Sequence, residues 1–353
     1  MSAQKRAVLL VNLGSPQSSR TSDVRSYLKE FLSDPCVIDL PAWFRYLLVN
    51  GIIAPFRSFR SAKLYKMLDT DRGFPLIYHS MDLEAQVRDR LTQATDLFLA
   101  MRYGEPSLKK LLHRIKEQDY SELMILPLYP QYATSTTGSV VRLLQTELEG
   151  HQLAGSTQII PHFHMYEDFI ELWTRKILSF NPSAYDAIVF SFHGIPVRQT
   201  KKTHPEASCE SMQCEHRYTL TNRYCYRAAC FQTSRSISKI LKIGPKKVYT
   251  SFQSRFGRNW LMPFTDQTLI TLAKDGKKRV LITSPAFVTD CLETRVEIAK
   301  EYFKLFKNAG GEELTLVPSL NSDPDWTTFI VKLISGSNQF SIKLHDADLE
   351  LMY

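Results

Sequence analysis

Eight short apolar runs recur along the 353-residue chain, four in each half. The runs cover residues 7–11, 97–101, 123–128, 157–160, 187–192, 247–252, 279–283 and 313–317. They are continuous rather than alternating, which is typical of parallel strands covered on both faces. Apolar stripes with helical spacing lie between them, at Leu108, Leu111, Leu112 and Ile115 and at Ile298, Tyr302, Leu305 and Phe306. We therefore predict an α/β protein with two doubly wound, Rossmann-like domains and parallel sheets.

The two halves begin alike, because "LLVNLGSP" and "VFSFHGIP" each run from a strand into a Gly-x-Pro loop. No Gly/Ser linker marks the join. We place the first domain at 1–165, the second at 166–337 with an insert at 205–235, and a tail at 338–353. Ligands of such folds bind outside the carboxyl ends of the strands, so we expect the active-site cleft between the domains.

Composition narrows the class of protein. The net charge is +8, but Lys and Arg are dispersed, and the signal of a DNA-binding helix-turn-helix is missing, so no nucleic-acid partner is expected. The longest apolar stretch, 46–56, is shorter than the roughly 20 residues that span a bilayer. The N-terminal run ends in a strand-to-loop pattern rather than a signal-peptide cleavage region. We expect a cytoplasmic protein without structural disulfides.

The candidate catalytic residues follow predicted strands. GxGxxG, GxxxxGK[ST] and GxSxG patterns are missing from the sequence, which removes the usual signatures of dinucleotide binding, P-loops and nucleophile elbows. His193 follows a buried strand, and Glu293 and Glu297 share one helix face after Asp290. One interpretation is a structural histidine with a capping box between Asp290 and Glu293. The other is a histidine and two carboxylates that move protons and handle a divalent metal.

Aromatic and basic residues indicate the ligand. Tyrosines and arginines in "MRYGEPS" and "LYPQYATSTTGS" suit a flat, aromatic, acidic molecule, with Arg102 pairing a carboxylate. A core role for Tyr129 and Tyr132 is the alternative. The segment 41–59, "PAWFRYLLVNGIIAPFRSF", is interpreted either as a hydrophobic lip with transient membrane contact or as a buried helix–turn–helix.

Several long sequence motifs carry a resemblance to a known family. The chain resembles the ferrochelatases along nearly its whole length, through "DVRSYLKEFLSDPCVIDLP", "MRYGEPSL", "LPLYPQYATSTTGS", "IVFSFHGIP", "TSFQSRFGRNWLMPFTDQTL" and "SPAFVTDCLET", in family order. The resemblance implies a lyase with a porphyrin cleft. The implied reaction inserts ferrous iron into protoporphyrin IX to give protohaem, the last step of haem biosynthesis.

Individual positions carry the resemblance further. His193 matches the family's active-site histidine, as iron ligand or pyrrole proton acceptor. Glu293 matches the glutamate opposite it and a second ligand of the substrate iron, and Glu297 the next acidic residue of the metal and proton path. Leu13, Arg102, Tyr103 and Tyr129 match positions that line the porphyrin site.

The sequence departs from the family pattern at three places. Asp290-Cys291 stands where many members have Asp-His, which puts a second active-site histidine in doubt. "KKTHPEAS", residues 201–208, replaces the usual Gly-Asp-Pro-Tyr, and Met67 replaces a common Trp.

Four cysteines, Cys209, Cys214, Cys225 and Cys230, cluster after the His193 loop with the spacing C-x4-C-x10-C-x4-C. Disulfides fit a reducing compartment poorly, and zinc knuckles prefer C-x2-C spacings. Iron–sulfur proteins use C-x4-C, and some ferrochelatases bind a 2Fe–2S cluster. We therefore favour a 2Fe–2S cofactor on these four thiolates, structural or sensing. Because Cys225 and Cys230 would point about 140° apart on a continuous helix, we expect an interruption or a helix end there.

Other functions are also compatible with these sequence features. They are a coproporphyrin ferrochelatase, a chelatase inserting cobalt into another tetrapyrrole, a non-enzymatic haem carrier and an iron–sulfur regulator of nucleic acid. The paired carboxylates favour an enzyme. Any contact of segment 41–59 with the inner membrane would be peripheral, and the oligomeric state is not predicted.

Overall fold

A computed structural model describes residues 5–204, 206–336, 341–344 and 346. The chain forms two compact units, one of residues 1–162 with 321–353 and one of residues 163–320. The join at 162–163 lies three residues from the expected boundary. The end of the second unit differs from the prediction, because residues 321–336 belong to the first unit.

The first unit contains a five-stranded sheet in the order β2-β1-β3-β4-β9. Its strands are β1 (Arg6–Asn12), β2 (Thr95–Met101), β3 (Glu122–Pro127), β4 (Thr157–Ile159) and β9 (Ile342–Lys343). The first four pair in parallel, with Asn12 opposite Met101 and Val11 opposite Pro127, and they confirm the four predicted runs. The short β9 pairs antiparallel with β4 and was not predicted.

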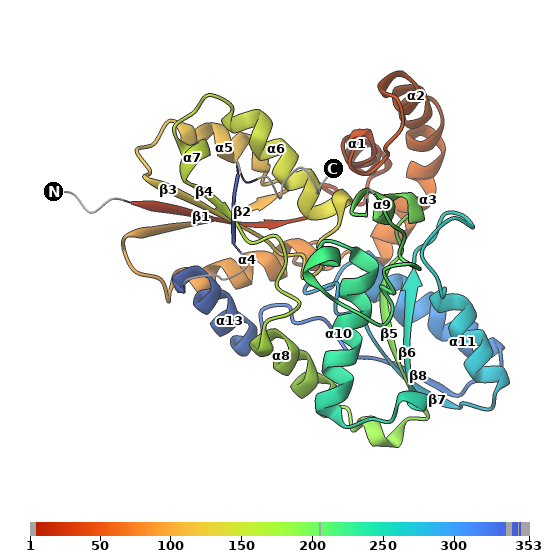
Figure 1. The fold of residues 1–353 in the computed structure, drawn as a ribbon. Helices are drawn as coiled ribbons and strands as arrows, with labels where there is room; N and C mark the ends of the chain where they lie inside the picture. Colours follow the sequence, from red (N-terminus) through yellow and green to blue (C-terminus); the bar gives the residue numbers. More distant parts are fainter. Residues whose placement is uncertain (1–4, 205, 337–340, 345, 347–353) are drawn as a thin grey trace. The chain divides into compact units, whose positions relative to one another are not determined.

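Helices cover both faces of this sheet. On one face lie α5 and α6, and on the other α4 and α13 (Figure 1). Their bounds are α4 (Pro75–Arg88), α5 (Leu108–Lys116), α6 (Ser139–Leu148), α7 (Leu153–Ser156) and α13 (Pro324–Ser335), with a π-helical turn η2 (Thr134–Gly138) before α6. The stripe predicted from Leu108 to Ile115 is the buried face of α5.

Helix α13 explains the difference in the domain boundary. Its apolar face is buried, and its threonines form hydrogen bonds with α4 and the turn after it: Thr327 with Gln86, and Thr328 with Arg90. Arg6 of β1 also donates to the backbone carbonyl of Ile334. The sequence of α13 shows an apolar face, but it does not show which sheet this face covers. The chain therefore returns to the first unit after Leu320.

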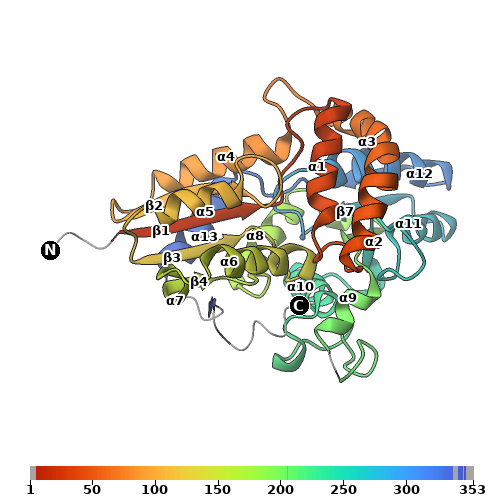
Figure 2. The ribbon, with the colours of Figure 1, turned by 90° about the horizontal axis from the view of Figure 1, so that it is seen from above.

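An N-terminal helical group completes the first unit. It comprises α1 (Thr21–Ser33), α2 (Ala42–Leu47), the π-helical η1 (Leu48–Ile53) and α3 (Ala54–Leu68). Helices α1 and α3 pack against each other, and Figure 2 shows α1, α2 and α3 grouped at one end of this unit. Residues 42–68 therefore form successive helices rather than a helix–turn–helix.

The second unit contains a four-stranded parallel sheet in the order β6-β5-β7-β8. Its strands, β5 (Ala187–His193), β6 (Val248–Gln253), β7 (Arg279–Thr283) and β8 (Glu313–Leu316), confirm the four runs predicted for the second half. Helices α8 (Glu167–Leu178) and α10 (Tyr226–Leu241) pack together on one face of the sheet, and α11 (Thr265–Lys274) lies on the other (Figure 1). Helix α12 (Phe303–Asn308) packs against α11.

Shorter elements connect these parts of the second unit. They are η3 (Pro182–Ala184), α9 (Val197–Lys202), η4 (Leu220–Asn222), η5 (Pro245–Lys247) and the π-helical η6 (Glu293–Tyr302). The second predicted stripe runs through η6 and α12, where Ile298, Tyr302 and Phe306 are buried in the core beside the sheet. Helix α12 ends at Asn308, and Gly310, with a φ of +104°, follows this end.

Candidate active site

His193 is the last residue of β5, at the carboxyl edge of the second sheet. The six residues before it are buried, while His193 itself is partly exposed. Its Nδ1 lies 2.6 Å from the carbonyl oxygen of Gly194, and its ring meets Phe287 edge-on at 6.1 Å between centroids. Because Nδ1 is engaged by the backbone, Nε2 is the ring nitrogen left for a proton or a metal.

The backbone after His193 packs closely against β6. His193 stands opposite Gln253 in the strand register, and Gly194 N–H donates to the Gln253 carbonyl at 2.7 Å. A Cβ on Gly194 would lie 2.7 Å from that same oxygen, so any larger residue would push the loop away from β6. Gly194 therefore allows the loop to approach β6 closely, and this approach fixes the backbone position of His193.

Gln253 is buried and connects three elements by its side-chain amide. Its Oε1 accepts hydrogen bonds from Ser191 at 2.7 Å and Ser284 at 3.3 Å, and its Nε2 donates to Glu297 at 3.4 Å. Ser191 lies in β5 and Ser284 directly follows β7, so the amide ties both strands to helix η6. Gln253 belongs to none of the site residues predicted from the sequence.

Glu297 is held by several donors. Oε1 accepts from the Tyr302 hydroxyl at 2.7 Å and from the Ser254 backbone N–H at 3.0 Å, and Oε2 accepts from the Ser254 hydroxyl. Burial raises the pKa of Glu297, against the lowering effect of Ser254 and Tyr302; Glu293 raises this pKa further and His193 lowers it. His193 and Glu293 therefore both lie within electrostatic range of Glu297.

Glu293 begins the π-helical η6, which follows Leu292 without a side-chain cap among the described residues. Asp290 Oδ1 instead accepts from the Thr294 hydroxyl at 3.0 Å and from Ser319 N–H at 3.3 Å. Asp290 therefore bonds to Thr294, one residue beyond the position expected for a capping box. π-helical turns are frequent at functional sites, and this one carries both glutamates in its first turns.

Cys291 occupies the position where many family members carry histidine. Its thiol is buried, and burial together with the Glu293 carboxylate raises its pKa well above the ordinary value. A neutral thiol at this position supplies neither a proton acceptor nor a charge near Glu293.

In the first unit, Arg102 and Tyr103 take part in a buried network centred on Asp34. Arg102 forms a salt bridge with Asp34, the Tyr103 hydroxyl donates to Asp34 at 2.9 Å, and the Ser139 hydroxyl donates at 2.6 Å. Burial raises the pKa of Tyr103 well above its ordinary value. The polar groups of Arg102 and Tyr103 are thus already engaged within the protein.

Leu13 and Tyr129 are the other two residues predicted to line the porphyrin site. Leu13 is partly exposed just beyond β1, where its carbonyl accepts from Tyr103 N–H at 2.9 Å. Tyr129 follows β3 and is buried, and its hydroxyl has no hydrogen-bond partner within the described part of the chain. A buried hydroxyl without a partner costs free energy, which a bound molecule or water would recover. Tyr132 is a core residue.

The segment 41–59 exposes its apolar side chains. Phe56 is 76% exposed and Trp43 67%, and the other exposed members are Phe44, Tyr46, Leu47, Ile52 and Phe59. The alternative of a buried helix–turn–helix is therefore wrong. No helix among the described residues is long and apolar enough to cross a membrane.

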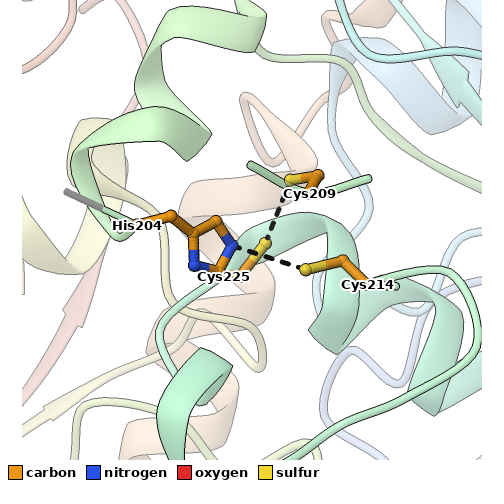
Figure 3. A group of neighbouring side chains, drawn as sticks. All are labelled: His204, Cys209, Cys214 and Cys225. Carbon is orange, nitrogen blue, oxygen red and sulfur yellow. Dashed lines mark hydrogen bonds between the residues drawn. The ribbon is translucent and has the colours of Figure 1, made fainter. Parts of the chain in front are cut away.

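The insert gathers three of the four clustered cysteines with a histidine. Ligand atoms of His204, Cys209, Cys214 and Cys225, one from each residue, lie within 4.8 Å of one another (Figure 3). Cys209 Sγ is 3.6 Å from Cys225 Sγ, and Cys214 Sγ is 3.4 Å from His204 Nε2. All four residues are buried. A buried set of three thiols and one imidazole is the chemistry of a metal centre.

Cys230 is not brought into this group. Helix α10 begins at Tyr226 with Cys225 as its N-cap residue and continues through Cys230 to Leu241. The expected helix end is therefore present at Cys225, but Cys230 lies within regular helix. Cys36 and Cys291 are also elsewhere, as the sequence indicated.

Comparison with solved structures identifies the fold. SirB from Bacillus subtilis, solved with Fe3+, superposes with a TM-score of 0.51 at 11% identity, covering 94% of each chain. A multi-domain protein from Deinococcus radiodurans with structural similarity to chelatases gives a TM-score of 0.50 at 10% identity, covering 96% of this chain and 56% of the other. The fold is that of the chelatases.

Sequence comparison identifies the family. The Ferrochelatase family pattern matches residues 5–338. Ferrochelatase of Coxiella burnetii (strain Dugway 5J108-111) is 38% identical over 341 residues, 95% of this chain and 94% of that protein. Ferrochelatase of Legionella pneumophila (strain Philadelphia 1) is 37% identical over 332 residues, 94% of this chain and 99% of that protein. The chain belongs to the ferrochelatase family, whose members are enzymes that insert iron into porphyrin.

Proposed function

We propose that the protein inserts ferrous iron into protoporphyrin IX to form protohaem, the last step of haem biosynthesis. One observation supports this proposal above the others: in a chain of this family, His193 ends a strand of the second sheet, and both His193 and Glu293 lie within electrostatic range of Glu297. Parallel α/β sheets bind their ligands at the carboxyl edge. A coproporphyrin substrate is the nearest alternative, and a haem carrier would not need the grouped carboxylates.

The reaction requires that two pyrrole N–H protons leave while a dication enters. Nε2 of His193 is the proposed proton acceptor or iron ligand, and Glu293 the proposed second ligand of the substrate iron. Glu297 would receive protons and pass them onward, because its raised pKa lets it hold a proton closer to neutral pH than an ordinary glutamate does. Charge balance is preserved, since two positive charges enter and two leave.

For porphyrin binding, Leu13 and Tyr129 are the proposed contacts. The partial exposure of Leu13 and the unsatisfied hydroxyl of Tyr129 support this assignment. Arg102 and Tyr103 are proposed to act indirectly, by holding the loop after β2 against Asp34.

The exposed segment 41–59 is proposed to touch the surface of the inner membrane from the cytoplasm. Its apolar side chains lie beside Arg45, Arg57 and Arg60 in the sequence, a combination that suits an anionic lipid surface. Such contact would keep the enzyme near an apolar substrate.

We further propose that the cysteine-rich insert holds an iron–sulfur cofactor, a 2Fe–2S cluster, with a structural or sensing role. The buried thiols support it, and the two close donor pairs, Cys209 with Cys225 and Cys214 with His204, resemble the two terminal ligands that each iron requires. The cluster would supply a redox-active, thiolate-held group, although iron insertion itself transfers no electron.

A single zinc ion is the second candidate for this centre. Two thiolates at about 2.3 Å from a tetrahedral zinc lie about 3.8 Å apart, close to the spacing found here. The upper limit of 4.8 Å between ligand atoms favours a small occupant, because a 2Fe–2S core would require the two donor pairs to move apart.

The proposed substrate is tested by an anaerobic assay with ferrous iron and either protoporphyrin IX or coproporphyrin III. We expect a higher kcat/KM for protoporphyrin IX. A clear preference for coproporphyrin III would assign the alternative, and binding of haem without turnover of either porphyrin would indicate a carrier.

A further inference from the structure

A histidine stands directly before the insert, at the same spacing as the first two cysteines of the insert. His204, Cys209 and Cys214 follow one another at intervals of five residues, so the pattern is H-x4-C-x4-C-x10-C. Backbone hydrogen bonds shape this run, with Cys214 N–H donating to the Cys209 carbonyl at 2.9 Å and Ala207 N–H to the His204 carbonyl at 3.2 Å. The turns direct one imidazole and two thiols toward Cys225 (Figure 3).

Cys225 contributes its thiol to this group from the beginning of a helix. It is the N-cap residue of α10, with extended backbone angles, so its thiol is not constrained by a preceding helical turn. Cys230 is five residues further along, which corresponds to about 140° around the axis of a regular helix. Its side chain interacts with Tyr226, whose ring lies 6.5 Å from that of Phe252 in β6. Cys230 therefore faces the sheet and Cys225 faces the insert.

The contacts of Asn222 support the grouping of His204 with the three cysteines. Asn222 is buried and donates its side-chain N–H to Cys214 Sγ at 3.5 Å and to the Arg217 carbonyl at 3.0 Å. Its Oδ1 accepts from Thr219 N–H at 2.7 Å, which fixes the orientation of the amide. N–H donors to sulfur are characteristic neighbours of metal-bound thiolates, because they stabilise the negative charge.

We propose that the metal centre is bound by His204, Cys209, Cys214 and Cys225, and that Cys230 is not a ligand. This inference rests on the metal centre proposed above and replaces the all-cysteine set expected from the sequence. The three thiols lose their protons as three metal–sulfur bonds form, and the neutral imidazole binds through Nε2 without electron transfer. The bound group would fasten the segment after α9 to the beginning of α10.

The ligand set is tested by metal and sulfide analysis of protein purified without oxygen. We compare the unmodified chain with His204→Ala, Cys214→Ser and Cys230→Ala. The first two variants should retain less than about half of the metal bound by the unmodified chain, because each removes one of the four ligands. Cys230→Ala should retain all of it, and it is the matched control because it removes a buried thiol from the same insert. If Cys230→Ala does not fold, Cys230→Val provides the same comparison.

A further variant tests the imidazole spectroscopically. His204→Cys should keep the metal and change its signature: the visible absorption of a cluster, or the charge-transfer bands of the Co²⁺-substituted protein if the metal is zinc. Two irons with two acid-labile sulfides, or one zinc without sulfide, would each support the ligand set and decide the metal. Loss of metal from the Cys230 variants with full retention by His204→Ala would overturn the inference. An unmodified chain without any bound metal would overturn the proposed centre itself, while leaving iron insertion unaffected.

Discussion

Gln253 and Glu297 are joined by a side-chain hydrogen bond, with 3.4 Å between Nε2 and Oε2. This bond links the strand beside His193 to the helix that carries both glutamates. Its donor is an amide that is buried and also accepts from two serines, so its orientation is fixed.

Replacing Gln253 with Leu should therefore change catalysis through Glu297. The variant removes the buried acceptor that Ser191 and Ser284 share and leaves Ser191 with Thr265, at 2.8 Å, as its remaining partner, at a cost of about 1–3 kcal/mol in the free energy of unfolding. We expect a lower kcat and a changed pH profile with little change in KM for the porphyrin. Gln253→Glu keeps an acceptor for Ser191 but puts a second carboxylate beside Glu297, and should shift the pH profile most. A purely structural Gln253 would lower stability in both variants and leave the profile of the remaining activity unchanged.

Glu297→Gln should alter the pH dependence of stability. A carboxyl group whose pKa is raised in the folded state binds its proton more tightly there than in the unfolded chain. The free energy of unfolding therefore falls as pH rises from the ordinary value of 4.5 through the raised value. Glutamine does not titrate, so the variant should gain stability relative to the unmodified chain as the pH rises above the ordinary value of a glutamate. Urea unfolding at several pH values measures this, and parallel curves for the two proteins would contradict it.

Asp34 is expected to be a stability residue of the first unit. Its carboxylate pairs with Arg102 and accepts from Tyr103 and Ser139, and breaking a buried ion pair from one side costs about 3 kcal/mol. Asp34→Ala should therefore lower the free energy of unfolding by about that amount, as measured by urea unfolding.

The control for Asp34 is a more exposed ion pair in the same unit. Asp82→Ala breaks the pair between Asp82 and Arg72 and should lower the free energy of unfolding far less, because water screens exposed charges. Equal losses in the two variants would show that the Asp34 network is not specially stabilising.

The exposed segment 41–59 should determine binding to lipid vesicles. Trp43→Ser combined with Phe56→Ser removes the two most exposed apolar side chains of the segment and should weaken sedimentation with anionic vesicles at least about tenfold. Leu220→Ser provides a control, because Leu220 is similarly exposed but lies in the second unit. Vesicle binding that is unchanged in the double variant would remove the membrane role from this segment.

The strands are predicted well from the sequence because each one is a continuous apolar run, and continuous runs are typical of sheets covered on both faces. The place of α13 could not be predicted, since its apolar face could cover either sheet. Asp34 and Gln253 could not be found for a similar reason: their partners lie far along the chain. His204 could have been found, because it repeats the five-residue spacing of Cys209 and Cys214 in a segment that departs from the family pattern. The expected tail, 338–353, lies largely outside the described residues.

His193 is proposed to take part directly in iron insertion, supported by Glu293. The most direct measurement is the anaerobic rate of protohaem formation from ferrous iron and protoporphyrin IX, for the unmodified chain, His193→Ala and Glu293→Gln, with porphyrin binding followed by fluorescence. We predict that both variants bind porphyrin and fold normally, and that His193→Ala forms protohaem at least about 100-fold more slowly. A turnover of His193→Ala close to that of the unmodified chain would contradict the account.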